Sequence, residues 1–236
     1  MVLHKNQHPL FGVMPVHAAG DDLVRKLLRE YPVPVDQSSP SKMYHVLMEL
    51  EHAVNAGVPG HVIELGCFQG GTTMMIRRLL DERKQKNREL HVYDSWEGVP
   101  EPVAQDEPVA GVRPFTKGLC STRRRTFNAN FARSGLLPPN VHTGWFGSIP
   151  DAEYPSQIAF AFFDGDMYSS IIDSFNKVYS KLSKGARVVI DDYDWERTPG
   201  VKKACEDFLR DKPERETLLP NYYGTGIGGG AVMVKL

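Results

Sequence analysis

The feature that most constrains the fold is an uninterrupted apolar run, Ile158–Phe163 (IAFAFF), which ends in Asp164. Because no alternate position is polar, the run predicts a strand buried on both faces, as in parallel sheets covered by helices. A second buried strand is predicted at Ala186–Ile190 (ARVVI), directly before Asp191. Apolar residues at helical spacing mark Ile171–Leu182 between them. The segment therefore predicts a strand–helix–strand unit of an α/β fold.

The rest of the chain continues this alternation. Further strands are predicted at 61–65, 89–94, 141–143, 215–219 and 231–236, and helices after Gly71 and at 119–136 and 199–211. Gly185 is placed to end the helix that precedes Ala186–Ile190. Residues 98–117, rich in Pro and Gly, predict a long surface loop. Residues 20–57 predict helices interrupted between Pro32 and Pro40. We therefore expect an N-terminal helical extension or lid at 1–57 and one α/β domain at 58–236.

Composition excludes several classes of protein. With 28 Lys+Arg against 29 Asp+Glu in 236 residues, the net charge of −1 gives no support for a broad nucleic-acid-binding surface. No run approaches the roughly 20 apolar residues of a membrane span, and the polar N-terminus shows no secretory signal. Three widely spaced cysteines argue against a disulfide framework and suit a reducing cytoplasm. We expect a cytoplasmic protein with neither nucleic-acid nor membrane partners.

The turn after the first buried strand, within 62–72 (VIELGCFQGGT), is rich in glycine. Its spacing is G-x-x-x-G-G rather than G-x-G-x-x-G, so a pyrophosphate fits it less well than a ligand without phosphates. Glu64 would repel a pyrophosphate and attract an ammonium group. Asp94, which ends the next strand, can accept both hydroxyls of a ribose, and Trp96 can cover an adenine. Together these residues favour an adenosine-containing ligand over a plain strand–turn–helix.

Two pairs of acids follow the two buried strands. Asp164 and Asp166 follow the first strand, and Asp191 and Asp192 follow the second. If the strands are neighbours, both pairs emerge at one edge of the sheet, where carboxylates repel one another unless a positive charge compensates. A hard divalent cation such as Mg²⁺ would do so, and it could hold two substrate oxygens and lower a hydroxyl pKa. The alternative is that these acids cap the following helices.

Five segments occur together in an order and spacing that resemble a known family. They are VIELGCFQGGTT, YDSWEGVP, VHTGWFGSIPD, FFDGDMYSS and VVIDDYDWERTPGVKKACEDF. Over about residues 40–212 the chain resembles the macrocin O-methyltransferase-like family of class I S-adenosylmethionine-dependent methyltransferases, several of which methylate sugar hydroxyls in natural-product pathways. The resemblance implies a Rossmann-like, seven-stranded, mostly parallel sheet that ends in an antiparallel hairpin around the Gly-rich turn 226–230. It also suggests a homo-oligomer.

The resemblance implies an O-methyltransferase that uses S-adenosylmethionine and Mg²⁺ on a hydroxyl of a small molecule such as a sugar. Asp164, Asp191 and Asp192 would hold the metal, and Asp166 would be the general base, although the two acids of the DGD element could exchange roles. The implied cofactor-binding residues are Glu64, Gly66, Phe68, Gly70, Gly71, Thr72, Asp94, Ser95, Trp96 and Asp164. The competing functions are an NAD(P)-dependent oxidoreductase and a non-catalytic nucleotide-binding module. The glycine spacing and the acid pairs argue against the oxidoreductase.

Some positions depart from the family pattern or allow two interpretations. Gln69 stands where the family often carries a basic residue, and the N-terminal region is short, which leaves the acceptor open. The run Arg123–Arg125, with Lys117 nearby, is either a solvated helix face or a grip for a phosphate-bearing acceptor. Trp145 and Phe146 follow a strand end and either line the pocket or belong to the core.

Overall fold

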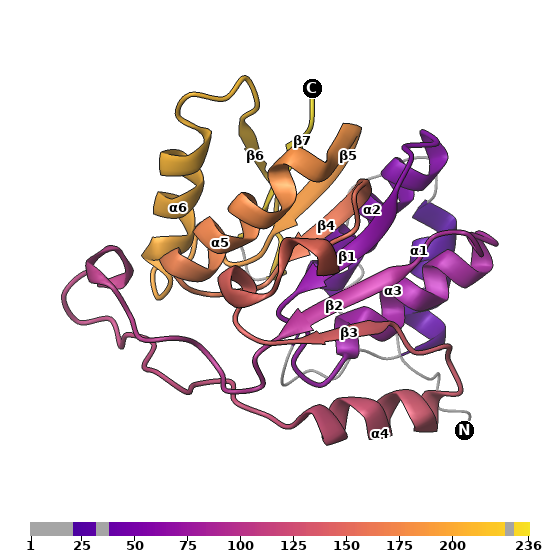
Figure 1. Ribbon diagram of the computed structural model, residues 1–236, viewed down its shortest axis with the longest axis horizontal. Coiled ribbons are helices and arrows are strands. Elements are labelled where there is room, and N and C mark those ends of the chain that lie inside the picture. The colour runs from indigo at the N-terminus through magenta and orange to yellow at the C-terminus, as the bar shows by residue number, and fades with distance from the viewer. Residues whose placement is uncertain (1–20, 32–37, 225–228) are drawn as a thin grey trace, which may run out of the picture.

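The structure is a computed structural model, and it describes residues 21–31, 38–224 and 229–236 (Figure 1). Its centre is a seven-stranded sheet with strand order β3-β2-β1-β4-β5-β7-β6. The strands are β1 His61–Leu65, β2 Leu90–Asp94, β3 Asn140–Thr143, β4 Ile158–Phe163, β5 Leu182–Ile190, β6 Glu216–Leu218 and β7 Ala231–Val234. Only β7 runs antiparallel to its neighbours β5 and β6. The predicted mostly parallel sheet with a C-terminal antiparallel hairpin is therefore confirmed.

Strand order reverses between β1 and β4, and this opens a crevice at the carboxyl ends of the strands. The register aligns the last residues of the three central strands, Leu65, Phe163 and Ile190. The backbone ladder continues one step further, since Asp164 N–H donates to Leu65 O at 2.8 Å and Asp191 N–H donates to Phe163 O at 2.9 Å. The two acidic elements consequently emerge side by side.

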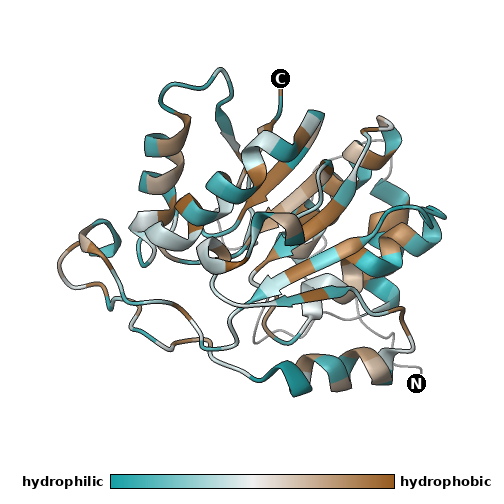
Figure 2. Cartoon of the chain, viewed as in Figure 1, coloured by the Kyte–Doolittle hydropathy of each residue, from teal (hydrophilic) through white to brown (hydrophobic). Residues whose placement is uncertain are grey.

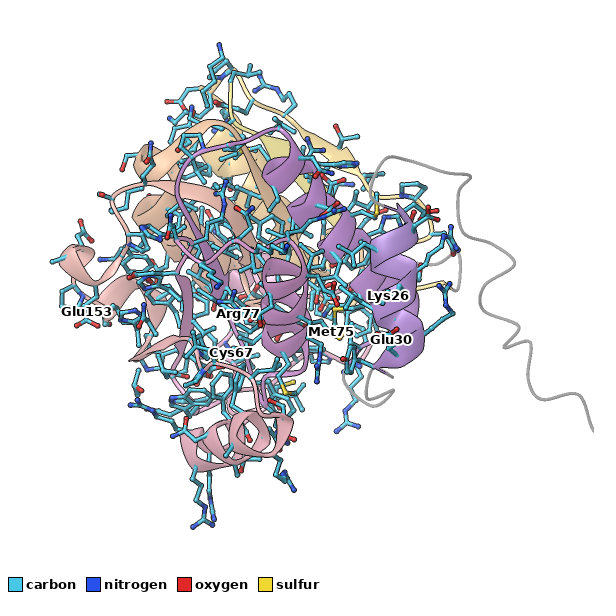
Figure 3. All side chains as sticks on the ribbon, turned by 90° about the vertical axis from the view of Figure 1, so that its right-hand side faces the viewer. Lys26, Glu30, Cys67, Met75, Arg77 and Glu153 are labelled. Atoms are coloured by element: carbon cyan, nitrogen blue, oxygen red, sulfur yellow. The ribbon has the colours of Figure 1, made fainter. Side chains whose placement is uncertain are left out.

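Helices cover both faces of the sheet. On one face α1 Asp21–Glu30, α2 Pro40–Asn55 and α3 Gly71–Glu82 pack together, and α2 also contacts β4 and β5. Figure 3 views this flank, with Lys26 and Glu30 on α1 and Met75 and Arg77 on α3. On the other face α5 Tyr168–Val178 packs on α6 Pro199–Leu209 (Figure 1). Between β2 and β3 the chain forms α4 Arg124–Ser134, and short 3-10 turns occur at Ala104–Asp106, Phe146–Ser148, Asp151–Glu153 and Tyr179–Lys181.

The core lies where the sequence pattern places it. All six residues of β4 are buried, and the strands form the apolar centre of the molecule (Figure 2). In α2, the side chains of Met43, Leu47 and Leu50 recur at helical spacing and are fully buried. None of the described helices is long and apolar enough to cross a bilayer.

Two sequence predictions need correction in detail, and one falls partly outside the described residues. Gly185 does not end a helix, because α5 stops at Val178 and β5 already begins at Leu182. Gly185 lies inside β5 with φ +82°, a conformation that favours glycine, and its N–H donates to Lys235 O. The helix predicted at 119–136 begins only at Arg124. Of the predicted hairpin turn, residues 225–228 lie outside the described residues.

Hydrogen bonds to Glu214 stabilise the C-terminal end of the chain, and the pKa of Glu214 makes this stabilisation pH-dependent. Its carboxylate accepts hydrogen bonds from Lys235 Nζ at 2.5 Å and Tyr179 Oη at 2.6 Å. Burial raises the pKa of Glu214, but these hydrogen bonds outweigh it and lower the pKa from 4.5 to about 2. The stabilisation is therefore complete above pH 4.5, the unfolded value, and is lost as the pH falls toward 2.

We expect Glu214→Gln to lower the thermal unfolding midpoint at pH 7. The decrease should be smaller at pH 3, because partial protonation of Glu214 removes part of the stabilisation that its carboxylate gives the wild type. Glu206→Gln is the matched control, because Glu206 is exposed on α6. Scanning calorimetry at both pH values measures the two differences. An equal loss at pH 3 and pH 7 would show that packing, rather than the charge of Glu214, holds the strand.

Candidate active site

A cavity of about 880 Å³ opens at the carboxyl ends of the central strands. It brings together eight of the predicted site residues: Gly66, Phe68, Asp94, Ser95, Asp164, Asp166, Asp191 and Asp192. Glu64, Gly70, Gly71, Thr72 and Trp96 are not part of its lining. The glycine turn and Asp94 thus share one pocket with both acid pairs, as the sheet topology requires.

The turn after β1 requires glycine at position 66. Gly66 has φ +90°, and a Cβ built on it would lie 1.9 Å from the carbonyl oxygen of Asp164. No side chain fits that space, because the ends of β1 and β4 approach each other there. Gly66 therefore lets the glycine-rich turn after β1 lie in direct contact with the DGD element.

Asp94 is held in place by backbone amides of the same turn. Its Oδ2 accepts hydrogen bonds from Cys67 N–H at 3.0 Å and Phe68 N–H at 2.9 Å. Its Oδ1 accepts from Trp96 N–H at 2.7 Å. The carboxylate is thus fixed at the pocket wall, and Oδ1 keeps lone-pair capacity for a further donor such as a hydroxyl.

Two residues of the predicted cofactor set lie behind the pocket wall. Glu64 is buried and accepts a hydrogen bond from the Thr73 hydroxyl, and its burial raises its pKa to about 8. Trp96 packs against Phe127 of α4, and its Nε1–H donates to Thr143 Oγ1 at 3.2 Å. Their contacts with an ammonium group and an adenine stay predictions.

A lysine ammonium group lies between the two acid pairs, a contact that the sequence patterns did not predict. Lys42 of α2 reaches between the two strand ends, where its Nζ contacts Asp191 and lies 3.2 Å from Asp164 Oδ2. The Tyr223 hydroxyl contacts Asp192 and donates to Asp191 Oδ1 at 3.2 Å. One sequence feature could have indicated this contact: Lys42 directly precedes Met43, which is buried in α2.

One ammonium group does not balance four carboxyl groups. Burial raises the pKa of Asp164 and Asp192 well above their usual range, and the charge of Asp191 raises both further. Burial and Asp164 together raise the pKa of Asp166 to about 7. Burial by itself lowers the pKa of Lys42, but the surrounding acids outweigh it and raise that pKa. The raised pKa values show that one ammonium group does not compensate four carboxylates, and the acids offer only oxygen donors, a set that fits a hard divalent cation.

Backbone strain is concentrated at the pocket. Among the described residues, seven that are not glycine have positive φ. Four of them line the pocket: Phe68, Cys120, Asp166 and Asp192. Such conformations are uncommon outside glycine and persist where the surrounding structure enforces them, as at ligand-binding sites.

Comparison with known protein families identifies the family that has this arrangement. The model of the macrocin-O-methyltransferase (TylF) family matches residues 38–219, from the start of α2 to the end of β6. The chain belongs to the TylF family. The resemblance predicted from the sequence motifs is thereby confirmed.

The TylF-family relatives include enzymes that are named as O-methyltransferases. The mycinamicin III 3''-O-methyltransferase of Micromonospora griseorubida is 32% identical over 67% of this chain and 64% of its own length. The 8-demethyl-8-(2,3-dimethoxy-alpha-L-rhamnosyl)-tetracenomycin-C 4'-O-methyltransferase of Streptomyces olivaceus is 31% identical over 69% of this chain and 61% of its own length. The chain thus spans less than two thirds of the length of these relatives.

A solved structure supports the same fold. The O-methyltransferase NovP superposes with a TM-score of 0.68 at 24% identity, over 83% of this chain and 80% of NovP. At this identity the likeness supports the Rossmann-like methyltransferase fold, which agrees with the predicted fold class.

The loop between β2 and α4 forms one wall of the TylF-family pocket. Phe115 of this loop lines the pocket and packs edge-on against Trp195, with ring centroids 5.8 Å apart. The loop is anchored by the buried Asp106, which accepts hydrogen bonds from Val103 N–H at 2.9 Å and from Tyr168 N–H at 2.7 Å. Because Tyr168 begins α5, directly after the DGD element, Asp106 ties the loop to the acids.

The remaining sequence alternatives are settled by position. Trp145 and Phe146 line the pocket. Arg123, Arg124 and Arg125 are exposed and are absent from its lining, which favours the solvated helix face over the anion grip. Gln69, at the position that departs from the family pattern, does line the pocket.

Proposed function

We propose that the chain is an S-adenosylmethionine-dependent O-methyltransferase that methylates a sugar hydroxyl of a glycosylated natural product. The observation that carries this proposal is the single pocket in which the Gly66 turn and Asp94 face the acids Asp164 and Asp166. A nucleoside-type cofactor and a hydroxylated acceptor would meet there. The activities for which the TylF-family relatives are named support a sugar as the acceptor.

Methyl transfer requires alignment and the removal of one proton. In the proposed reaction the acceptor oxygen forms a bond to the methyl carbon while the bond from that carbon to the sulfonium sulfur breaks. S-adenosylhomocysteine then leaves as a neutral thioether. Asp166 accepts the hydroxyl proton, and its pKa of about 7 suits a base that works near neutral pH. Asp94 orients the ribose, and the backbone around Gly66 holds the methionine portion.

A divalent cation such as Mg²⁺ belongs to this proposal, with Asp164, Asp191 and Asp192 as its ligands. The oxygen-only donors support it, as do the raised pKa values of Asp164 and Asp192, which show that the carboxylates lack sufficient compensating positive charge. When bound, the ion would supply Lewis-acid stabilisation to the acceptor oxygen. Lys42 contributes one positive charge to the same acids and holds Asp164 and Asp191 together.

The aromatic part of the pocket lining suits a sugar with an apolar substituent. Aromatic side chains from separate segments line it, namely Phe115, Trp145, Phe146 and Trp195. Aromatic faces bury apolar ligand surface, and the few polar groups nearby fix its orientation. The acceptor hydroxyl would then point toward the acids.

Calorimetry with S-adenosylmethionine, S-adenosylhomocysteine and NAD separates the candidate functions. We expect the first two ligands to bind and NAD not to bind, and the reverse result would support an oxidoreductase. Methyl transfer to a panel of glycosylated acceptors, followed by mass spectrometry, distinguishes an enzyme from a non-catalytic module. Turnover should fall when a chelator is added and return with Mg²⁺. Equal turnover with and without chelator would contradict the metal role.

A further inference from the structure

Three histidines lie close together on the adjacent strands β1, β2 and β3, two of them near the amino ends of their strands. His61 is the first residue of β1, His91 the second of β2 and His142 the third of β3. The His91 and His142 rings stack with centroids 5.4 Å apart, and Tyr93 continues the stack on His142 at 4.6 Å. These side chains take no part in the proposed methyl transfer.

A chain of polar contacts runs through two of these histidines. His91 Nε2 lies 3.0 Å from Glu89 Oε2, and His91 Nδ1 lies 3.1 Å from His142 Nε2. His142 Nδ1 lies 2.9 Å from Glu153 Oε2. Each of the three contacts needs one proton between its two atoms, because two lone pairs that face each other repel. Two neutral imidazoles carry only two protons, so one of the three contacts lacks its proton. Asn140 Nδ2 lies 3.3 Å from Glu89 Oε2 and 3.4 Å from His91 Nε2, so its amide can donate to both atoms at that contact.

His61 is a third potential metal ligand beside the contact between Glu89 and His91. Within the described part of the chain, donor atoms of His61, Glu89 and His91 lie within 4.8 Å of one another. Imidazole nitrogen with one carboxylate oxygen is the donor set of many Zn²⁺ sites. We propose that His61, Glu89 and His91 bind a borderline divalent transition metal such as Zn²⁺, with water completing its coordination.

The pair Glu89 and His91 needs only a small adjustment to bind a metal. Zn²⁺ binds nitrogen and carboxylate oxygen at about 2.0–2.2 Å, so two ligand atoms of a tetrahedral site lie about 3.4 Å apart. The 3.0 Å between Glu89 Oε2 and His91 Nε2 is a few tenths of an ångström shorter. His61 Nδ1 accepts a hydrogen bond from Glu89 N–H at 3.1 Å, which the metal would replace if His61 binds through that atom.

A metal at this position also resolves the proton count. The ion takes the place of the missing proton between Glu89 and His91, so His91 carries its proton on Nδ1 and donates to His142. His142 then donates from Nδ1 to Glu153, which completes a carboxylate–histidine–metal arrangement. Burial lowers the pKa of His91, which favours the neutral ring that a metal requires. The site would link β1 to β2 and differs in donor chemistry from the acidic pocket.

Titration of the full-length, metal-free chain with Zn²⁺ in a calorimeter tests the proposal. We expect one site per chain, and at least about tenfold weaker binding in Glu89→Gln and in His61→Gln. Glu89 is largely exposed and His61 is half-buried, so both variants should fold. His52→Gln is the matched control, because His52 is a histidine of α2 that pairs with Glu49. It should bind Zn²⁺ like the wild type.

Two further measurements separate this site from others. Asp192→Asn should leave the Zn²⁺ affinity unchanged, and excess Mg²⁺ should not displace Zn²⁺ from the wild type. Zn²⁺ should raise the unfolding midpoint of the wild type but not that of Glu89→Gln. The proposal is overturned if no Zn²⁺ binds, or if Glu89→Gln and His61→Gln bind as tightly as the wild type. It is also overturned if binding disappears when the other histidines near the N-terminus, His4, His8 and His17, are replaced. Methyl-transfer activity does not enter these readouts, so failure of the proposed function leaves them unaffected.

Discussion

Replacing Asp166 by Asn is expected to lower the rate of methyl transfer by about 10²–10⁴-fold, the usual contribution of a general base. The amide is nearly isosteric but cannot take the hydroxyl proton. Binding of S-adenosylhomocysteine, measured by calorimetry, should be kept because Asp94 and the Gly66 turn remain. Asp194→Asn is the matched control, since the Asp194 side chain is 52% exposed and pairs with Lys202 at the surface.

The same experiment decides between the two acids of the DGD element. If Asp164→Asn removes turnover and Asp166→Asn does not, the roles of the two acids are exchanged. If both variants keep wild-type turnover, the proton acceptor is not an acid of this element and the proposed mechanism is wrong. Measuring kcat at saturating S-adenosylmethionine separates these outcomes from a defect in cofactor binding.

Replacing Lys42 by Met is expected to lower the free energy of unfolding by about 3–5 kcal/mol, the cost of removing one partner from a buried ion pair. Lys42 and Asp191 are both buried, and without the ammonium group the neighbouring acids lose the cation that they contact. Methionine keeps much of the side-chain volume, so the loss reflects charge rather than a cavity. Urea unfolding at pH 7 measures it.

Lys26→Met is the matched control for this substitution. Lys26 pairs with Glu82 at 3.3 Å, but its side chain is 46% exposed, and exposed ion pairs contribute little. Added Mg²⁺ should restore part of the stability of Lys42→Met, because the acids would then bind the divalent ion instead. An unfolding free energy equal to that of the wild type would show that the acids are not ionised around Lys42, which would weaken the proposed metal site as well.

Local pattern was sufficient for the elements that carry the acids. The boundaries of β1 and β4 coincide with those predicted, because β4 is a continuous apolar run that ends at Asp164 and β1 is a short, largely apolar run between Gly60 and Gly66. The motif of Gly66 and the DGD element also pointed to the family that the comparison confirms. Prediction failed where long-range pairing overrode local signals, as at Gly185, which lies inside a strand because β5 pairs with β7.

The sequence by itself determined the strands, the acids at their ends and the family, because each depends on neighbouring residues and on alternation along the chain. Only the tertiary structure decided which side chains meet. Lys42 reaches Asp164 across 122 positions of sequence, and Asp106 caps the start of α5 from a distant loop. Such contacts follow from how α2 and the loop pack on the finished sheet. No local spacing encodes them, because their partners become neighbours only when the apolar surfaces between them are buried.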